Sequence, residues 1–334
     1  MLFRTGRWHG RIAAADRQGS WRHPRTTGGD HYMTTQASAA RIGFIGLGAM
    51  GEPMAMQVAK GGHPVMLFDA DRARTDRIAR DSAGIAAGTP ADIGPWADIV
   101  VTMLPDSKIV EKVLFGDDGL AASLRAGSLV IEMSSGVPDA TRALAVRLGE
   151  AGLAMIDAPV SGGVTRARSG DLAIMVGGDP AMVERARPVL ELMGSSLVHV
   201  GGIGSAHAMK ALNNLVSAGG FLIGIEALLI GSRYGLSPEI MVDVLNASTG
   251  MNNSTQKKFK QFVLSRKFDA GFGLDLMVKD LGIALGVATA TDTTTPFSSL
   301  CHELWSAAQK TLGRGLDHTE VARFSEMIAG TELK

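Results

Sequence analysis

The sequence predicts an α/β protein in which a doubly wound parallel sheet is followed by an all-helical domain, joined to it by one long helix. Short apolar runs alternate with helical patterns from residue 41 to about residue 200, an alternation that is typical of βαβ units. Beyond about residue 203 only helical patterns continue. A length of 334 residues suits about two domains. We therefore expect domains at 39–202 and 203–330.

The expected strands are short apolar segments, and helical patterns fill most of the gaps between them. The first helix after the sheet is expected at 206–234 and spans about 40 Å. Ser237 and Pro238 begin the next helix, and Asp317 with Glu320 resembles a capping box for the last one. The strands are expected at 42–45, 65–68, 99–104, 128–133, 154–157, 172–176 and 197–200, and the later helices at 252–264, 275–290, 297–312 and 318–329.

A glycine-rich turn follows the first strand. Residues 41–51 read RIGFIGLGAMG, and a second strand ends at Asp69. In this fingerprint Gly46 permits the tight turn, Gly48 lets a pyrophosphate approach the backbone, and Gly51 lets the helix pack against the strand. A tight turn without a ligand is the alternative, but the helix start offers N–H groups to phosphates. The pattern predicts a Rossmann-type dinucleotide site whose turn residues are Gly46, Leu47, Gly48, Ala49, Met50 and Gly51.

Asp69 indicates which dinucleotide binds. A carboxylate at this strand end accepts hydrogen bonds from the ribose 2′-hydroxyl and repels a 2′-phosphate. NAD is therefore favoured over NADP. Arg72 and Arg74 lie just beyond Asp69. Although an arginine can hold a 2′-phosphate, we expect both to be solvated charges on the next helix.

Charge and cysteine content exclude several classes of protein. Basic and acidic residues number 33 each, so nothing indicates a nucleic-acid or acidic-lipid partner. The single cysteine, Cys301, excludes an internal disulfide, and no cluster of metal ligands is visible. A lone cysteine suits a reducing compartment, for which we expect the cytoplasm. The apolar stretch 215–231 contains Glu226, which favours a helix buried on all sides by its own protein over a membrane span.

The first 38 residues differ from the rest in composition. They carry Asp16 and Asp30 as the only acids and show no apolar periodicity. We expect a disordered tail or an over-long start, with Met33 as the true initiator. An arginine-rich transit peptide directed to the mitochondrial matrix is the alternative. The arginines concerned are Arg4, Arg7, Arg11, Arg17, Arg22 and Arg25.

Polar and glycine-containing loops follow three of the expected strands. Leu104 and Pro105 end one strand, and Ser134 and Ser135 end the next. Ligands bind at the carboxyl ends of strands in open α/β sheets. After residue 157 the sequence APVSGGV places Ser161, Gly162 and Gly163 in a bend whose N–H groups can cradle a carboxylate. Taken alone, this last motif is also compatible with an ordinary turn.

Lys210 and Asn214 are candidates for catalysis on the long helix. They are four residues apart and therefore share a helix face. Burial among Ala, Met and Leu would lower the pKa of Lys210 towards the range useful for proton transfer. His207 is expected to be a local packing residue. Lys279 and Asp280 form either a surface pair or a group that closes the site from the helical domain.

Together these motifs resemble the β-hydroxyacid dehydrogenase family over about residues 41–330. The glycine turn resembles its cofactor motif and residues 157–163 its substrate motif. Lys210 to Asn214 resembles its catalytic helix, and Lys279-Asp280 its late pair. Four motifs in the same order are more specific than any one of them.

The resemblance implies a role for each matching position. Lys210 would be the general acid/base, and Asn214 would orient it and the substrate. Ser161, Gly162 and Gly163 would hold the substrate carboxylate. Lys279 would close the site beside the nicotinamide, with Leu104 and Pro105 near the cofactor. Ser135 stands where the family commonly has threonine, and would contact nicotinamide and substrate.

The implied activity is NAD-dependent interconversion of a small 3-hydroxy acid and its semialdehyde, in a homodimer or homotetramer. Substrates of the 3-hydroxyisobutyrate, glycerate or threonate type all fit. Arg166, Asn252, Asn253 and Ser254 could reach the far end of a substrate and favour the hydroxylated acids, or they could be loop and helix-cap polar residues far from the site, which we favour. An imine reductase on the same fold, which usually lacks the lysine, is one alternative function. A non-catalytic dinucleotide-binding relative is the other.

Overall fold

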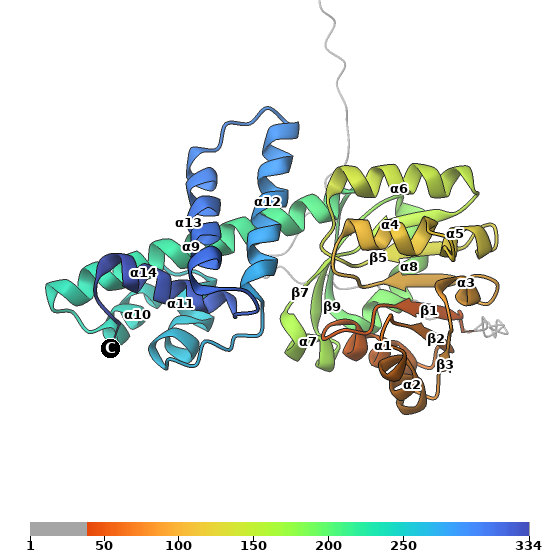
Figure 1. Cartoon of the computed structure of the whole chain (residues 1–334), viewed down its shortest axis with the longest axis horizontal. Helices are drawn as coiled ribbons and strands as arrows, with labels where there is room; N and C mark the ends of the chain where they lie inside the picture. Colours follow the sequence, from red (N-terminus) through yellow and green to blue (C-terminus); the bar gives the residue numbers. More distant parts are fainter. Residues whose placement is uncertain (1–38, 334) are drawn as a thin grey trace, which may run out of the picture. The chain divides into compact units, whose positions relative to one another are not determined.

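The computed structural model describes residues 39–333, and the expectations for residues 1–38 lie outside the described residues. Nine strands form one sheet in the order β3-β2-β1-β4-β5-β6-β8-β7, with β9 paired to β8 (Figure 1). The strands are β1 Ile42–Ile45, β2 Val65–Phe68, β3 Ile85–Ala86, β4 Ile99–Thr102, β5 Leu129–Glu132, β6 Ala154–Asp157, β7 Val160–Ser161, β8 Leu172–Gly177 and β9 Gly194–Gly201.

The sheet is parallel from β3 to β6 and mixed beyond that point. β1 pairs in parallel with both β2 and β4, and β5 and β6 extend the parallel series. β8 runs antiparallel to β6 and β7. The expected parallel pairing is therefore confirmed for β1, β2, β4, β5 and β6 and wrong where β8 meets β6. The short strands β3 and β7 were not expected.

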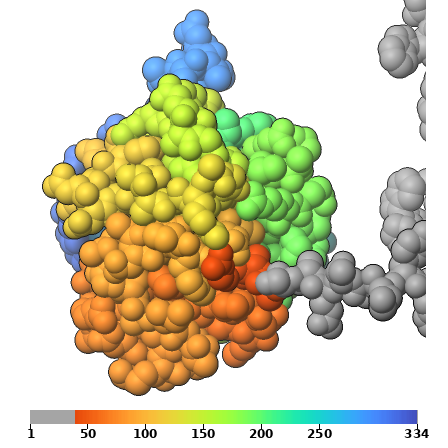
Figure 2. Space-filling model, turned by 90° about the vertical axis from the view of Figure 1, so that its right-hand side faces the viewer, coloured from red at the N-terminus to blue at the C-terminus, as the bar shows by residue number. Residues whose placement is uncertain are grey.

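Eight helices cover the sheet between its strands. Apolar residues from the strands and these helices form the core on both sides of the sheet. Figure 2 looks at this region from one side, where residues preceding α9 make up most of the visible surface. The helices are α1 Gly51–Lys60, α2 Arg72–Asp81, α3 Pro90–Ile93, α4 Ser107–Phe115, α5 Leu120–Ser123, α6 Pro138–Glu150, α7 Gly163–Ser169 and α8 Pro180–Met193.

A helical region follows, built along α9 Ser205–Tyr234. Trp305, Phe221 and Phe259 are fully buried at its centre, with the Phe221 ring packed edge-on against the other two. The expected boundary near residue 202 falls in the turn before α9 and stays a prediction. The other elements are α10 Pro238–Asn246, α11 Asn253–Lys257, a π-helical turn Phe259–Leu264, α12 Leu274–Ala290, α13 Pro296–Leu312, a 3₁₀ turn His318–Glu320 and α14 Val321–Ala329.

Two local expectations for the helical region are wrong. A single helix at 252–264 is instead two pieces, because the backbone at Lys258 leaves helical geometry. Asp317 caps the turn at the start of the last helix as expected, but Glu320 does not complete a capping box with it. The Asp317 carboxylate accepts hydrogen bonds from the backbone of Gly271, Phe272 and Thr319 and thereby ties the last helix to the segment before α12.

The helix α9 is long and apolar enough to cross a membrane by length and composition, and half of that stretch is buried inside the protein. The expectation that 215–231 is buried on all sides is wrong. Val216 and Ile230 are 76% and 71% exposed, and Ile223 is also exposed. One side of α9 faces the protein core while the other presents aliphatic side chains at the surface.

Candidate active site

In the glycine turn after β1, Gly46 and Gly51 are tightly packed, whereas Gly48 has open space beside it. Gly46 has a φ of +94°, and a Cβ there would clash with the carbonyl oxygen of Met103. A Cβ on Gly51 would clash with the carbonyl oxygen of Gly46. A Cβ on Gly48 would meet no described atom within 4 Å, so packing alone does not require glycine there. The residues therefore fit a dinucleotide whose pyrophosphate lies against Gly48.

The start of α1 and the end of β2 complete this cradle. α1 begins after Met50 without a side-chain cap, which leaves its first N–H groups for an anion. Ala49 lies between Gly48 and Met50 in the same turn. The carboxylate of Asp69 accepts a hydrogen bond of 2.7 Å from the N–H of Leu47. Asp69 is thus held beside the turn, where the fingerprint places the ribose-binding acid.

The two arginines after Asp69 behave differently. Arg72 pairs with Asp76 on its own helix, as expected of a solvated charge. Arg74 instead pairs with Asp69 at 3.2 Å and with Asp71 at 3.4 Å, so the expectation for Arg74 is wrong. Its guanidinium lies against the carboxylate that the fingerprint assigns to the cofactor ribose.

The loops after β4 and β5 are joined to each other. The N–H of Leu104 donates to the Oγ of Ser134 at 2.9 Å, and the N–H of Ser134 donates to Glu132 at 2.8 Å. Ser134 is fully buried and therefore fixes the loop that carries Ser135. The side chain of Ser135 makes no hydrogen bond within 39–333 that would compete with a ligand.

The Ser-Gly-Gly loop leaves the sheet beside β8. Ser161 pairs with Ala173 in the sheet, and Gly162 and Gly163 take φ values of +137° and +68°. These conformations favour glycine and start α7. Arg166, expected as a possible substrate contact, pairs instead with Asp171 at 3.2 Å. No hydrogen bond within the described part of the chain joins this loop to Lys210 or Asn214.

Lys210 lies on the buried face of α9 and is 7% exposed. Its ammonium makes no hydrogen bond to any residue within 39–333. Burial lowers the pKa of Lys210; the charge of Asp280 opposes this shift and that of Lys279 adds to it. A buried lysine without a partner is suited to exchange a proton with a ligand.

Asn214 connects Lys210's face of α9 to α12. Its side-chain amide donates to Asp280 at 2.6 Å, and Asp280 is 3.5 Å from the ammonium of Lys279. Lys279 in turn donates to the carbonyl oxygens of Ser135 at 3.0 Å and Pro105 at 3.3 Å. Of the two expectations for Lys279-Asp280, the pair that closes the site is the one the geometry supports.

A buried polar cluster under the site was missed by sequence reasoning. The ring of His207 lies 2.8 Å from Glu132 and 2.7 Å from Thr141, and Asp157 accepts from the N–H groups of Gly204 and His207. Burial lowers the pKa of His207, but the charges of Glu132 and Asp157 outweigh this and raise it overall. His207 is therefore more than a packing residue, because it ties the first turn of α9 to the ends of β5 and β6.

The three polar residues of the helical region that could reach a substrate serve mainly local structure, which is the interpretation that the sequence favoured. Asn252 caps α11 and donates to the carbonyl of Gly220. Asn253 is exposed. The buried hydroxyl of Ser254 has no hydrogen-bond partner within 39–333.

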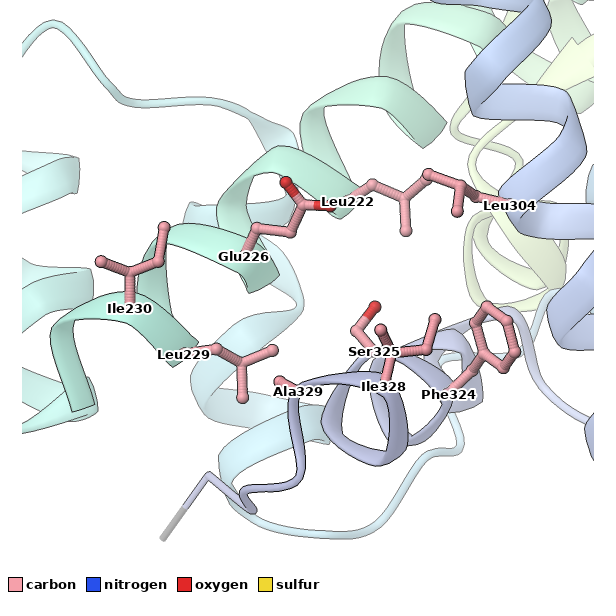
Figure 3. Close-up of a pocket in the computed structure, with 9 residues that line it drawn as sticks. All are labelled: Leu222, Glu226, Leu229, Ile230, Leu304, Phe324, Ser325, Ile328 and Ala329. Atoms are coloured by element: carbon pink, nitrogen blue, oxygen red, sulfur yellow. The ribbon is translucent and has the colours of Figure 1, made fainter. Parts of the chain in front are cut away.

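The clearest hollow in the helical region is not part of this constellation. It holds about 210 Å³ and lies between α9, α13 and α14 (Figure 3). Figure 3 shows Glu226 among otherwise mostly apolar side chains. None of the predicted catalytic or cofactor residues lines it.

Two family models match the chain in succession. The NAD binding domain of 6-phosphogluconate dehydrogenase matches residues 41–201. The family described as "NAD-binding of NADP-dependent 3-hydroxyisobutyrate dehydrogenase" matches residues 204–325.

Curated proteins and solved structures are similar over nearly the same span. 2-(Hydroxymethyl)glutarate dehydrogenase of Eubacterium barkeri is 35% identical over 88% of this chain and 97% of its own length. NAD-dependent L-serine dehydrogenase of Pseudomonas aeruginosa is 38% identical over 79% of this chain and 91% of its own. The structure of Mycobacterium tuberculosis 3-hydroxyisobutyrate dehydrogenase with L-serine has a TM-score of 0.79 at 31% identity, covering 86% of this chain and 99% of that one.

Proposed function

The chain belongs to the β-hydroxyacid dehydrogenase family, and on this basis we propose that it interconverts a small 3-hydroxy acid and its semialdehyde with NAD. The observation that carries the proposal is Lys210: a buried lysine without a hydrogen-bond partner in 39–333, one turn before an asparagine that Asp280 holds in place. The relatives act on 2-(hydroxymethyl)glutarate, L-serine and 3-hydroxyisobutyrate by their names, and each of these is a 3-hydroxy acid.

Lys210 handles the proton of the reaction. In oxidation its neutral amine accepts the proton of the substrate hydroxyl as the carbonyl forms, and in reduction its ammonium returns that proton to the carbonyl oxygen. NAD held at the Gly46–Gly51 turn would supply the acceptor for the hydride of the hydroxyl-bearing carbon. Asn214 lies on the same helix face as Lys210, and its bond to Asp280 fixes the amide that orients the substrate oxygen.

The substrate carboxylate is assigned to the Ser161–Gly163 bend. Gly162 and Gly163 take positive φ values in this bend, and a glycine bend can present backbone N–H groups to an anion. Lys279 anchors α12 to the carbonyls of Ser135 and Pro105. This bridge holds α12 against the loops after β4 and β5.

A substrate panel tests the proposal. Purified protein with NAD is offered 3-hydroxyisobutyrate, L-serine, glycerate, threonate and 2-(hydroxymethyl)glutarate, and reduced nicotinamide is followed by absorbance. Turnover of at least one compound is expected. Absence of turnover with every compound, in both directions, would refute the assignment. Cyclic imines in the same assay decide between this activity and an imine reductase, which Lys210 disfavours.

We also propose a homodimer or homotetramer, because α9 exposes aliphatic side chains in a row. Val216, Ile223 and Ile230 recur every seven residues and therefore lie on one face. An exposed apolar stripe of this kind is typical of a contact between subunits. The number of subunits is left to measurement.

A further inference from the structure

Lys258 is a second lysine that the proposed reaction does not use. It stands between α11 and the π-helical turn, where the backbone bends. Its ammonium donates to the hydroxyl of Ser217 on α9 at 3.3 Å. It also lies 5.9 Å from the centre of the Phe221 ring. These contacts hold the side chain against α9.

The charge of Lys258 is not neutralised by the protein. No carboxylate within 39–333 approaches it to within ion-pair distance. Asp317 is the acid that acts on it from further away, but that carboxylate already accepts backbone bonds from Gly271, Phe272 and Thr319. Burial lowers the pKa of Lys258 to about 8. A half-buried cation without a counter-charge raises the free energy of the folded protein. An anion bound beside it would lower that free energy.

The position of Lys258 relative to Lys210 follows from α9. Ser217 is seven residues after Lys210 and lies on the same helix face, with Asn214 between them. Seven residues correspond to about 10 Å along the helix. A hydrogen bond of about 3 Å at Lys210 and another at Ser217 leave space between them for a chain of a few carbons.

We propose that Lys258 and Ser217 bind a second carboxylate of the substrate, so that this enzyme acts on short hydroxy dicarboxylic acids. The first carboxylate lies in the Ser161–Gly163 bend, the hydroxyl at Lys210, and the far carboxylate at Lys258. This inference rests on the proposed function for the location of the hydroxyl. Oxidation leaves the far carboxylate chemically unchanged, since it serves only to bind.

A matched pair of substrates tests the subsite. 2-(Hydroxymethyl)glutarate and 2-(hydroxymethyl)pentanoate share the hydroxymethyl group and the first carboxylate, and differ in whether the side chain ends in a carboxylate or a methyl group. The ratio of their kcat/KM values is measured for the natural protein, Lys258→Met, Lys258→Arg and Ser217→Ala. Lys257→Met serves as the control, because Lys257 is an exposed neighbour on α11.

The expected result is a clear preference of the natural protein for the dicarboxylate. Lys258→Met reduces that preference roughly 10- to 100-fold, the range for losing a charge-assisted hydrogen bond. The change appears mainly in KM. Lys258→Arg retains part of the preference, and Lys257→Met retains all of it. Equal ratios in the natural protein and in Lys258→Met would overturn the subsite.

A binding measurement separates failure of the subsite from failure of the proposed function. If no hydroxy acid is turned over, the thermal midpoint of the NAD-loaded protein is compared with and without glutarate, with butyrate as the monoanionic control. Stabilisation by glutarate in the natural protein but not in Lys258→Met supports the subsite while the oxidoreductase assignment fails. No difference between the two proteins overturns the subsite as well.

Discussion

The two ends of α9 differ in which kinds of side chain they bury and expose. The segment from Ser205 to Asn214 buries His207, Lys210 and Asn214, whereas the segment beyond it carries the most exposed aliphatic side chains of the helix. Lys210 is 7% exposed, while Val216, six residues later, is 76% exposed. Both arrangements are unfavourable for an isolated chain, because a buried charge and an exposed aliphatic group each raise the free energy of the folded monomer.

We interpret both ends of α9 as binding surfaces, the first for a substrate and the second for another subunit. At the first end the buried lysine is compensated when a substrate supplies its hydrogen-bond partner. At the second end the aliphatic row is compensated when another subunit covers it. If this interpretation is correct, substitutions at the first end should change chemistry and those at the second end should change assembly.

The largest expected effect is on turnover. Replacement of Lys210 by Met removes the group that exchanges the substrate proton, and kcat should fall by roughly 10²- to 10⁴-fold. NAD binding, followed by fluorescence titration, should be nearly unchanged because the glycine turn is untouched. Lys310→Met, at an exposed lysine of α13, is the control with normal kcat. Near-normal turnover in Lys210→Met would remove Lys210 from the mechanism.

The next effect is on stability at the first end of α9. Glu132 and His207 form a fully buried pair, and loss of one partner leaves the other without compensation. We expect Glu132→Ala to lower the free energy of unfolding by about 3–5 kcal/mol, measured by chemical denaturation. His207→Gln combined with Glu132→Gln, which removes both charges and keeps a hydrogen bond, should recover much of that loss. If the loss of unfolding free energy in the double variant equals the sum of the losses in the two single variants, the pairing is contradicted.

The same pair predicts how stability depends on pH. Burial raises the pKa of Glu132, but the His207 charge and hydrogen bonds outweigh it and the pKa lies below its ordinary 4.5. The pKa of His207 lies above its ordinary 6.5. The contribution of Glu132 is therefore lost as pH falls below 4.5, and that of His207 is lost as pH rises above 6.5. The stability difference between the natural protein and the double Gln variant should be largest between these two values.

A smaller effect is expected on assembly at the second end. Replacement of Val216 or Ile230 by Glu places a charge in the row that we assign to a subunit contact, and the mass measured by light scattering should shift towards monomer. Val146 on α6 is also exposed, at 63%, but lies outside the row, so Val146→Glu should leave the mass unchanged. If the natural protein is monomeric at micromolar concentration, the assignment of the aliphatic row to a subunit contact is wrong.

The sequence predicted those parts of the site that are local. Gly46 to Gly51 and Asp69 belong to one βαβ unit, and Lys210 and Asn214 are one helical turn apart, so spacing alone relates them. It did not predict how Lys279 reaches Ser135 and Pro105, which are 144 and 174 residues away in the chain. The pairs Asn214–Asp280 and Glu132–His207 were missed for the same reason. Each depends on how α9 and α12 pack on the sheet, which no local pattern encodes.

The edge of the sheet and the surface of α9 were mispredicted for a related reason. The apolar run 172–176 is a strand in either direction, and nothing in it indicates that β8 runs antiparallel to β6. Likewise an apolar helix that is buried in its own chain and one that meets a second subunit have the same composition. Hydropathy reports the apolar character of Val216 and Ile230 but not which molecule covers them.

The smallest expected effect lies outside α9, at the end of β2 beside the glycine turn, and should leave catalysis intact. Asp69 accepts from Leu47 and from Arg74, so Asp69→Asn removes the charge that repels a 2′-phosphate and frees Arg74 to bind one. The ratio of kcat/KM for NAD to that for NADP should narrow by roughly 10-fold, the equivalent of one charge-assisted hydrogen bond. Because Lys210 is unaffected, kcat at saturating cofactor should stay close to that of the natural protein. Arg72→Ala is the matched control, since Arg72 pairs with Asp76 and not with Asp69. A natural protein that already prefers NADP would mean that Arg74, not Asp69, determines the choice of cofactor.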